Sequence, residues 1–123
     1  MLNLLNPELR IRDIRKLVEP HLHEVNWERG VDETSEWVLA SFENENYKNR
    51  LVSWLTSKNI SNTKIAIVTD KTWSTIQTTP CIDLLAKPDM IFNKNHSIVI
   101  ACDRSWVIDY AAEQEVIRFG RWE

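Results

Sequence analysis

The sequence is poor in the residues that build phosphate loops, linkers and disulfide frameworks. Its 123 residues include only 2 glycines, 4 prolines and 2 cysteines. Glycine-rich loops form where a backbone approaches a phosphate closely, and neither Gly30 nor Gly120 lies in such a pattern. The nucleophile motif GxSxG is missing as well. These shortages exclude the common nucleotide-binding loops, and 43% hydrophobic residues predict a folded chain instead of a disordered one.

Long apolar runs are missing too. The longest, residues 98–102, has five residues, whereas a membrane-spanning helix needs about 20. The first leucines are interrupted by asparagine and precede Arg10 and Arg12, which is the wrong order for a secretory signal. Cys81 and Cys102 form no CxxC pair. We therefore expect a cytoplasmic chain without a membrane partner, in which both cysteines are packed thiols.

Apolar residues recur at helical spacing in two places in the first half. Asn6 and Pro7 are typical of a helix start and Pro20 cannot continue a helix, so the first pattern predicts a helix over residues 7–19. The second pattern predicts a helix over residues 43–57. The apolar positions are Ile11, Ile14, Leu17 and Val18 in the first, then Tyr47, Leu51, Trp54 and Leu55 in the second. Each helix should present one apolar face to a core.

Strand patterns dominate the second half. Residues 65–68 are apolar on both faces, which predicts a strand inside a sheet. Residues 36–42 alternate, so a strand is favoured there over a short helix, and a right-handed crossover would follow if both strands were parallel in one sheet. Thr79 and Pro80 suit one helical turn that Pro88 ends. Four short apolar runs then predict an antiparallel meander: 90–92, 97–102, 105–110 and 115–119.

The fold class that follows is a single α+β domain over residues 1–123. N-terminal helices should pack on a mostly antiparallel β-sheet, and the chain should close with a β-meander. No linker, repeat or low-complexity segment interrupts the sequence.

Side chains that could carry catalysis are few. Possible metal ligands are His21, His23 and Glu24 near the end of the first helix, and the carboxylates Asp70, Asp103 and Asp109 at strand ends. A metal site needs three or four converging donors, and the histidines would need a distant carboxylate or His96 as a third ligand. Cys102 could pair with His96 as a thiolate and its base, but it closes an apolar strand. A small metal-dependent hydrolase or nuclease is therefore one alternative, while the simpler interpretation makes the aspartates turn residues and predicts no catalytic residue, metal or cofactor.

Acidic residues are concentrated in one stretch of the sequence. The chain has 15 basic and 18 acidic residues and a net charge of −3, which argues against non-specific binding of nucleic acid. Between residues 19 and 47, Arg29 is the only basic residue among eight carboxylates: Glu19, Glu24, Glu28, Asp32, Glu33, Glu36, Glu43 and Glu45. A concentrated negative surface accelerates encounter with a basic partner. The other interpretation of this stretch is a solvated face that only keeps the protein soluble.

Six tryptophans are the second unusual feature. Trp54 and Trp106 lie at buried phases of their predicted elements, whereas Trp27, Trp37 and Trp73 lie in or beside irregular segments and are expected to be exposed. Tryptophan is enriched where interfaces concentrate their binding energy. The predicted partner-binding surface combines Glu24, Trp27, Glu28, Asp32, Glu33, Glu36, Trp37, Glu43 and Glu45. A nucleic-acid surface would instead interleave aromatic residues with lysine and arginine.

Three segments of the second half resemble bacterial immunity proteins: residues 64–70, 97–110 and 116–122. They contain a hydrophobic strand, a turn with Asp103 and a hairpin that carries Trp106. Immunity proteins are small cytoplasmic α+β proteins that protect a cell from polymorphic or contact-dependent growth-inhibition toxins. The resemblance implies a non-enzymatic inhibitor that covers the active site of a cognate toxin, often a basic nuclease, with carboxylates standing where substrate phosphates lie. A general protein-binding regulatory domain is the remaining alternative.

Overall fold

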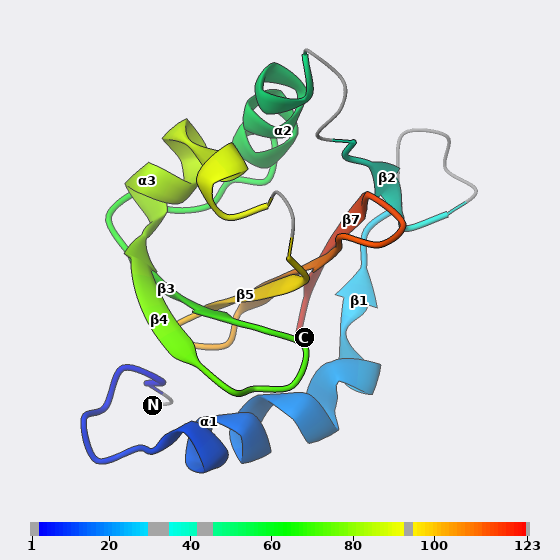
Figure 1. Ribbon diagram of the computed structural model, residues 1–123. Coiled ribbons are helices and arrows are strands. Elements are labelled where there is room, and N and C mark those ends of the chain that lie inside the picture. Colours follow the sequence, from blue (N-terminus) through cyan, green and yellow to red (C-terminus); the bar gives the residue numbers. More distant parts are fainter. Residues whose placement is uncertain (1–2, 30–34, 42–45, 93–94, 123) are drawn as a thin grey trace.

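A seven-stranded antiparallel sheet runs through the centre of the molecule (Figure 1). The computed structural model describes residues 3–29, 35–41, 46–92 and 95–122. The strand order is β1-β7-β6-β5-β3-β4, and β2 also pairs with β7. The strands are β1 (Asn26–Trp27), β2 (Val38–Leu39), β3 (Ile65–Thr69), β4 (Ile76–Pro80), β5 (Ser97–Ala101), β6 (Trp106–Ala111) and β7 (Val116–Arg121).

Helices cover both faces of this sheet. The helices α2 (Tyr47–Thr56) and α3 (Cys81–Ala86) and the 3₁₀ turn η2 (Pro88–Met90) lie on one face, which we call the α2 face (Figure 1). The helix α1 (Ile11–Val18) and the 3₁₀ helix η1 (Glu19–Glu24) lie on the other, the α1 face. The predicted α+β class, with helices packed on an antiparallel sheet, is confirmed.

The core consists of two buried clusters, one on each face of the sheet. Along β6, Trp106, Ile108 and Tyr110 belong to the cluster on the α2 face, while Val107 belongs to the cluster on the α1 face. Successive side chains of a strand point to opposite faces, so a strand covered on both sides must be apolar at nearly every position. The strand β5 is buried along its whole length. The predicted meander of β5, β6 and β7 is confirmed and lies at the centre of both clusters.

The helix boundaries differ from the predicted ones at their N-terminal ends. The first helix begins at Ile11 and not at residue 7, because the segment before it forms turns in which Asn6 Oδ1 accepts the Glu8 N–H at 3.0 Å. The chain then continues through Pro20 as η1. The second helix begins at Tyr47, and residues 43–45 of the predicted range lie outside the described residues.

Two strand predictions need correction, and one strand was missed. The strand predicted at residues 36–42 is present as the shorter strand β2, and residue 42 lies outside the described residues. The strands β2 and β3 run in the same direction in one sheet with β7, β6 and β5 between them, so α2 connects them as a crossover. The strand predicted at residues 90–92 is wrong, because Met90 ends the turn η2. The edge strand β4 was not predicted at all. It has polar side chains at Gln77, Thr78 and Thr79, so it carries little of the apolar signal that marks a buried strand.

Trp73 is buried, contrary to the expectation of exposure. Its side chain is only 4% exposed and packs in the cluster on the α1 face with Leu4 and Ile67. Its backbone has a φ of 57° in the turn that leads out of β3. Trp106 is buried, as expected.

Candidate partner-binding surface

The segment singled out by its carboxylates and tryptophans lies along one edge of the sheet. Its first half enters as β1, which pairs with the C-terminal end of β7, and its second half returns as β2, which pairs with the N-terminal end of β7. Two further backbone bonds extend these short strands: the Glu28 N–H donates to the Phe119 carbonyl at 2.8 Å and the Ala40 N–H donates to the Glu115 carbonyl at 2.7 Å. The segment is therefore held at both ends by β7.

Arg118 of β7 joins the two halves of this segment. Its guanidinium carbon lies 3.7 Å from the centre of the Trp27 ring and 4.4 Å from the centre of the Trp37 ring. Nη1 donates to Glu36 Oε1 at 2.6 Å, and Nε and Nη2 donate to Asp109 Oδ2 at 3.2 and 3.1 Å. Cation–π contacts and charge-assisted hydrogen bonds both strengthen as water is excluded. Trp27 and Trp37 are thus half-buried structural residues as well as surface residues.

Two of the three described carboxylates of the predicted surface, Glu28 and Glu36, have lysine or arginine partners. Glu28 lies 3.0 Å from Lys58 Nζ and 3.6 Å from Arg121 Nε, and Glu36 binds Arg118. Glu24 pairs with His21, and this hydrogen bond lowers the pKa of the carboxyl group.

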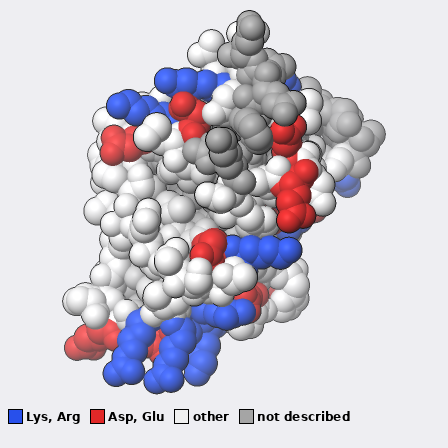
Figure 2. Space-filling model, viewed as in Figure 1, with Lys and Arg blue, Asp and Glu red and all other residues white. Residues whose placement is uncertain are grey.

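The remaining four carboxylates of the predicted surface lie outside the described residues: Asp32, Glu33, Glu43 and Glu45. Acidic side chains in Figure 2 are scattered over the visible face, several of them next to basic ones, while basic side chains gather at the end where α1 lies. The expectation of a continuous, unpaired acidic surface therefore fails for the described part of the segment. The cations come from distant parts of the sequence, so a count of charge along one stretch misses them.

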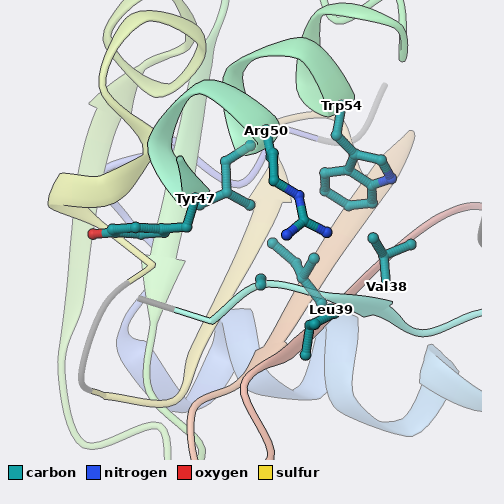
Figure 3. Close-up of a pocket in the computed structure, with 8 residues that line it drawn as sticks. Val38, Leu39, Tyr47, Arg50 and Trp54 are labelled. Atoms are coloured by element: carbon teal, nitrogen blue, oxygen red, sulfur yellow. The ribbon is translucent and has the colours of Figure 1, made fainter. Parts of the chain in front are cut away.

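A small pocket lies between β2 and α2, beside this segment. Its volume is about 100 Å³, and its lining consists of Val38, Leu39, Ala40, Tyr47, Arg50, Leu51, Trp54 and Ile117. Figure 3 shows the Arg50 guanidinium and the Trp54 ring pointing from α2 toward Val38 and Leu39. Leu39 is 55% exposed, the highest exposure of a large apolar residue in β2 and α2. The sequence pattern placed Leu39 in a strand but gave no sign that it borders a pocket.

The residues proposed for a metal-dependent hydrolase do not converge. Asp70 and Asp103 lie at opposite ends of the antiparallel pair β3–β5. Asp109 is bound to Arg118 and pairs with His96, whose Nε2 atom lies 3.1 Å from Asp109 Oδ1, and no third candidate joins this pair among the described residues. His21 and His23 lie in the 3₁₀ helix η1 and not in an extended segment. Within the described residues, no three histidine, cysteine, aspartate or glutamate side chains are grouped to hold a metal ion.

The two cysteines are free and lie in different surroundings. Cys81 is buried, and burial raises the pKa of its thiol to about 11, so it is protonated at neutral pH. Cys102 is partly exposed at one end of β5, whereas His96 lies at the other end. The pair therefore does not form a thiolate and its base.

The hydrogen bonds that Asp70 accepts should make the stability of the fold depend on pH in the acid range. Its carboxylate accepts hydrogen bonds from the side chain and backbone of Ser74 and from those of Thr72, which lower its pKa from 3.8 to about 2. A pKa lowered in the folded state stabilises the fold above the unfolded pKa, and this contribution is lost as the pH falls through the folded pKa. We expect Asp70→Asn to be less stable than the wild type at pH 6 and the difference to shrink between about pH 4 and pH 2. Urea unfolding across this range measures it, and a difference independent of pH would contradict it.

Comparison of the chain with family models, with curated proteins and with solved structures finds no match. The resemblance to immunity proteins therefore stays a prediction. Within the described residues, no helix has both the length and the apolar character needed to cross a membrane.

Proposed function

We propose that this chain is a non-enzymatic inhibitor of the immunity type, which binds one cognate bacterial toxin and covers the toxin's active site. The observation that carries the proposal is the edge formed by β1 and β2, where exposed Leu39 borders a small, largely apolar pocket. Binding energy at protein interfaces concentrates in a few apolar anchors and the pockets they fill. This edge belongs to the same segment, from Glu24 to Glu45, that its tryptophans and carboxylates single out in the sequence.

The partner that this surface suits is a basic protein, such as a nuclease domain. The four carboxylates outside the described residues flank β2 in the sequence, and residues 30–34 and 42–45 include no basic residue. Glu28 forms ion pairs with Lys58 and Arg121, and Glu36 forms one with Arg118. These ion pairs hold the edge in place and are not available to the toxin. In this proposal, Leu39 and the pocket provide apolar anchoring, while the flanking carboxylates pair with lysines and arginines of the toxin.

The test begins with the product of the gene immediately upstream, co-expressed with this chain. The proposal expects rescue of growth and a tight complex that survives purification. Rescue without a complex would contradict direct inhibition, and several partners of moderate affinity would favour a general regulatory domain instead.

Variants of the complex then test the surface. Leu39→Asp should raise Kd about tenfold or more, mainly through faster dissociation. Ile11→Asp is the matched control, because Ile11 is a 40% exposed apolar residue on α1. Charge reversals at Asp32, Glu33, Glu43 and Glu45 should each slow association at low salt, whereas Glu8→Lys, the same charge change at an exposed residue before α1, should not. Unchanged kinetics in Leu39→Asp and in all four reversals would exclude this surface.

A further inference from the structure

The strand β4 forms the edge of the sheet opposite to β1 and β2. The Cys81 N–H donates to the Lys64 carbonyl at 2.9 Å, and this pair continues the register of β4 with β3. Hydrogen-bonded and non-hydrogen-bonded pairs alternate along an antiparallel ladder. The N–H and C=O groups of Ile76 and Thr78 therefore point away from β3. Within the described residues, no backbone hydrogen bond outside the sheet involves either residue.

This edge has little of the usual protection against pairing with another chain, apart from Pro80, which removes one outward N–H group at the end of the strand. Natural edge strands are blunted by charged side chains, proline or bulges. Residues 72–82 contain no charged residue, and Pro80 stands only at the last position of β4. Gln77 and Thr78, in the middle of the strand, are both exposed. The edge is thus accessible and neutral.

The neutral run is bounded by charges of opposite sign. Lys71 precedes it and Asp83 follows it, and both side chains are exposed. Neither forms an ion pair with any described residue. An antiparallel arrangement of two such runs brings the lysine end of one run next to the aspartate end of the other.

We propose that β4 pairs with β4 of a second copy of this chain, antiparallel and about a two-fold axis at Gln77. In this register, Ile76 of each copy lies opposite Thr78 of the other, so their outward N–H and C=O groups bond reciprocally. The antiparallel arrangement also puts the turn that carries Lys71 of each copy at the same end of the contact as helix α3 of the other copy, which carries Asp83. A two-fold interface is self-complementary and closes, so it yields a dimer and not a fibre. The exposed side chains of Ile65 and Ile82, beside the Pro80 end, border this contact.

Sedimentation velocity over about a hundredfold range of concentration tests for the dimer, whose population rises with concentration. Thr78→Pro should abolish it, because proline removes an outward N–H and leaves the ladder with β3 intact. Gln77→Lys should also abolish the dimer, because it places two like charges opposite each other at the axis. A monomer at every concentration, or a dimer that withstands both substitutions, would overturn the proposal.

Charge exchange tests the orientation of the two copies. Lys71→Glu and Asp83→Lys should each raise the dimer Kd by about tenfold, because each turns two symmetric attractions into repulsions. The double variant Lys71→Glu with Asp83→Lys should restore the wild-type Kd. Lys16→Glu and Glu8→Lys are the matched controls and should have no effect. If each single variant raises the dimer Kd and the double variant raises it further, this register is excluded.

Cross-linking tests the register directly. In a Cys102→Ser background, Gln77→Cys should form an intermolecular disulfide, because residues at the axis of a non-hydrogen-bonded pair have their Cα atoms about 4.5 Å apart. Thr79→Cys should not, since it lies opposite residue 75 of the other copy. Disulfide formation by Thr79→Cys alone would contradict the register. The outcome is independent of the toxin-binding proposal, which concerns the opposite edge of the sheet.

Discussion

Replacing Arg118 by methionine is expected to lower the free energy of unfolding by about 2 kcal/mol, because it removes charge-assisted hydrogen bonds between part-buried side chains. Methionine keeps an apolar side chain beside the two tryptophan rings but removes the hydrogen bonds that Arg118 donates to Asp109 and Glu36, which leaves Asp109 paired with His96. The side chains of Arg118 and Asp109 are only 22% and 16% exposed, so water replaces the lost contacts poorly. Urea denaturation measures the change. The edge formed by β1 and β2 should become less ordered as well, and the affinity for the toxin should fall with it.

Two variants separate the causes of this loss. Arg15→Met removes the ion pair with Glu19, whose side chains are 47% and 41% exposed, and should cost less than about 1 kcal/mol. Arg118→Lys retains the charge but cannot bind a carboxylate with two parallel N–H groups or stack on the rings, so it should recover only part of the stability. Equal losses from Arg118→Met and Arg15→Met would mean that the junction contributes no more than an exposed ion pair.

The parts of the fold that sequence patterns predicted are those whose signal is local and repeated. The meander of β5, β6 and β7 is apolar on both faces, and the buried Leu51 and Leu55 of α2 keep helical spacing. The strand β1 has two residues, Asn26 and Trp27, and exists because β7 holds it, so no pattern marks it. The run at residues 90–92 was too short to distinguish a strand from the turn after Pro88.

The candidate surface was only partly predictable for a different reason. Charge was counted along the sequence, but electrostatic energy depends on distance in space. Lys58, Arg118 and Arg121 lie far from Glu28 and Glu36 in the sequence and reach them through the fold. The count along the segment gives a negative charge, whereas the pairing of Glu28 and Glu36 depends on Lys58 beyond α2 and on two arginines of β7. The burial of Trp73 likewise depends on a turn after β3 that no periodicity reveals.

Gly120→Ala is expected to cost about 2 kcal/mol of unfolding free energy, as overpacking of a dense core does. Gly120 is buried opposite Trp27 in the pairing of β7 with β1. A Cβ atom there would lie 2.4 Å from Val25 Cγ1, 2.9 Å from the Asn26 carbonyl oxygen and 3.0 Å from Trp27 Cε3. Because one of these neighbours is backbone, a rotamer change cannot relieve the clash, and β1 must move away from β7.

A double-mutant cycle with Val25→Ala tests this cause. Val25→Ala removes the tightest contact of the added Cβ atom, so Gly120→Ala should lower the free energy of unfolding by less in that background. The loss that remains should come from the clash with the Asn26 carbonyl oxygen. Amide hydrogen exchange should increase in β1 while β6 stays protected, because only the edge is displaced. Strict additivity in the cycle, or uniform loss of protection across the sheet, would contradict local displacement. If β1 moves as expected, Trp27 leaves Arg118, and the variant should also impair toxin binding although Gly120 contacts no partner.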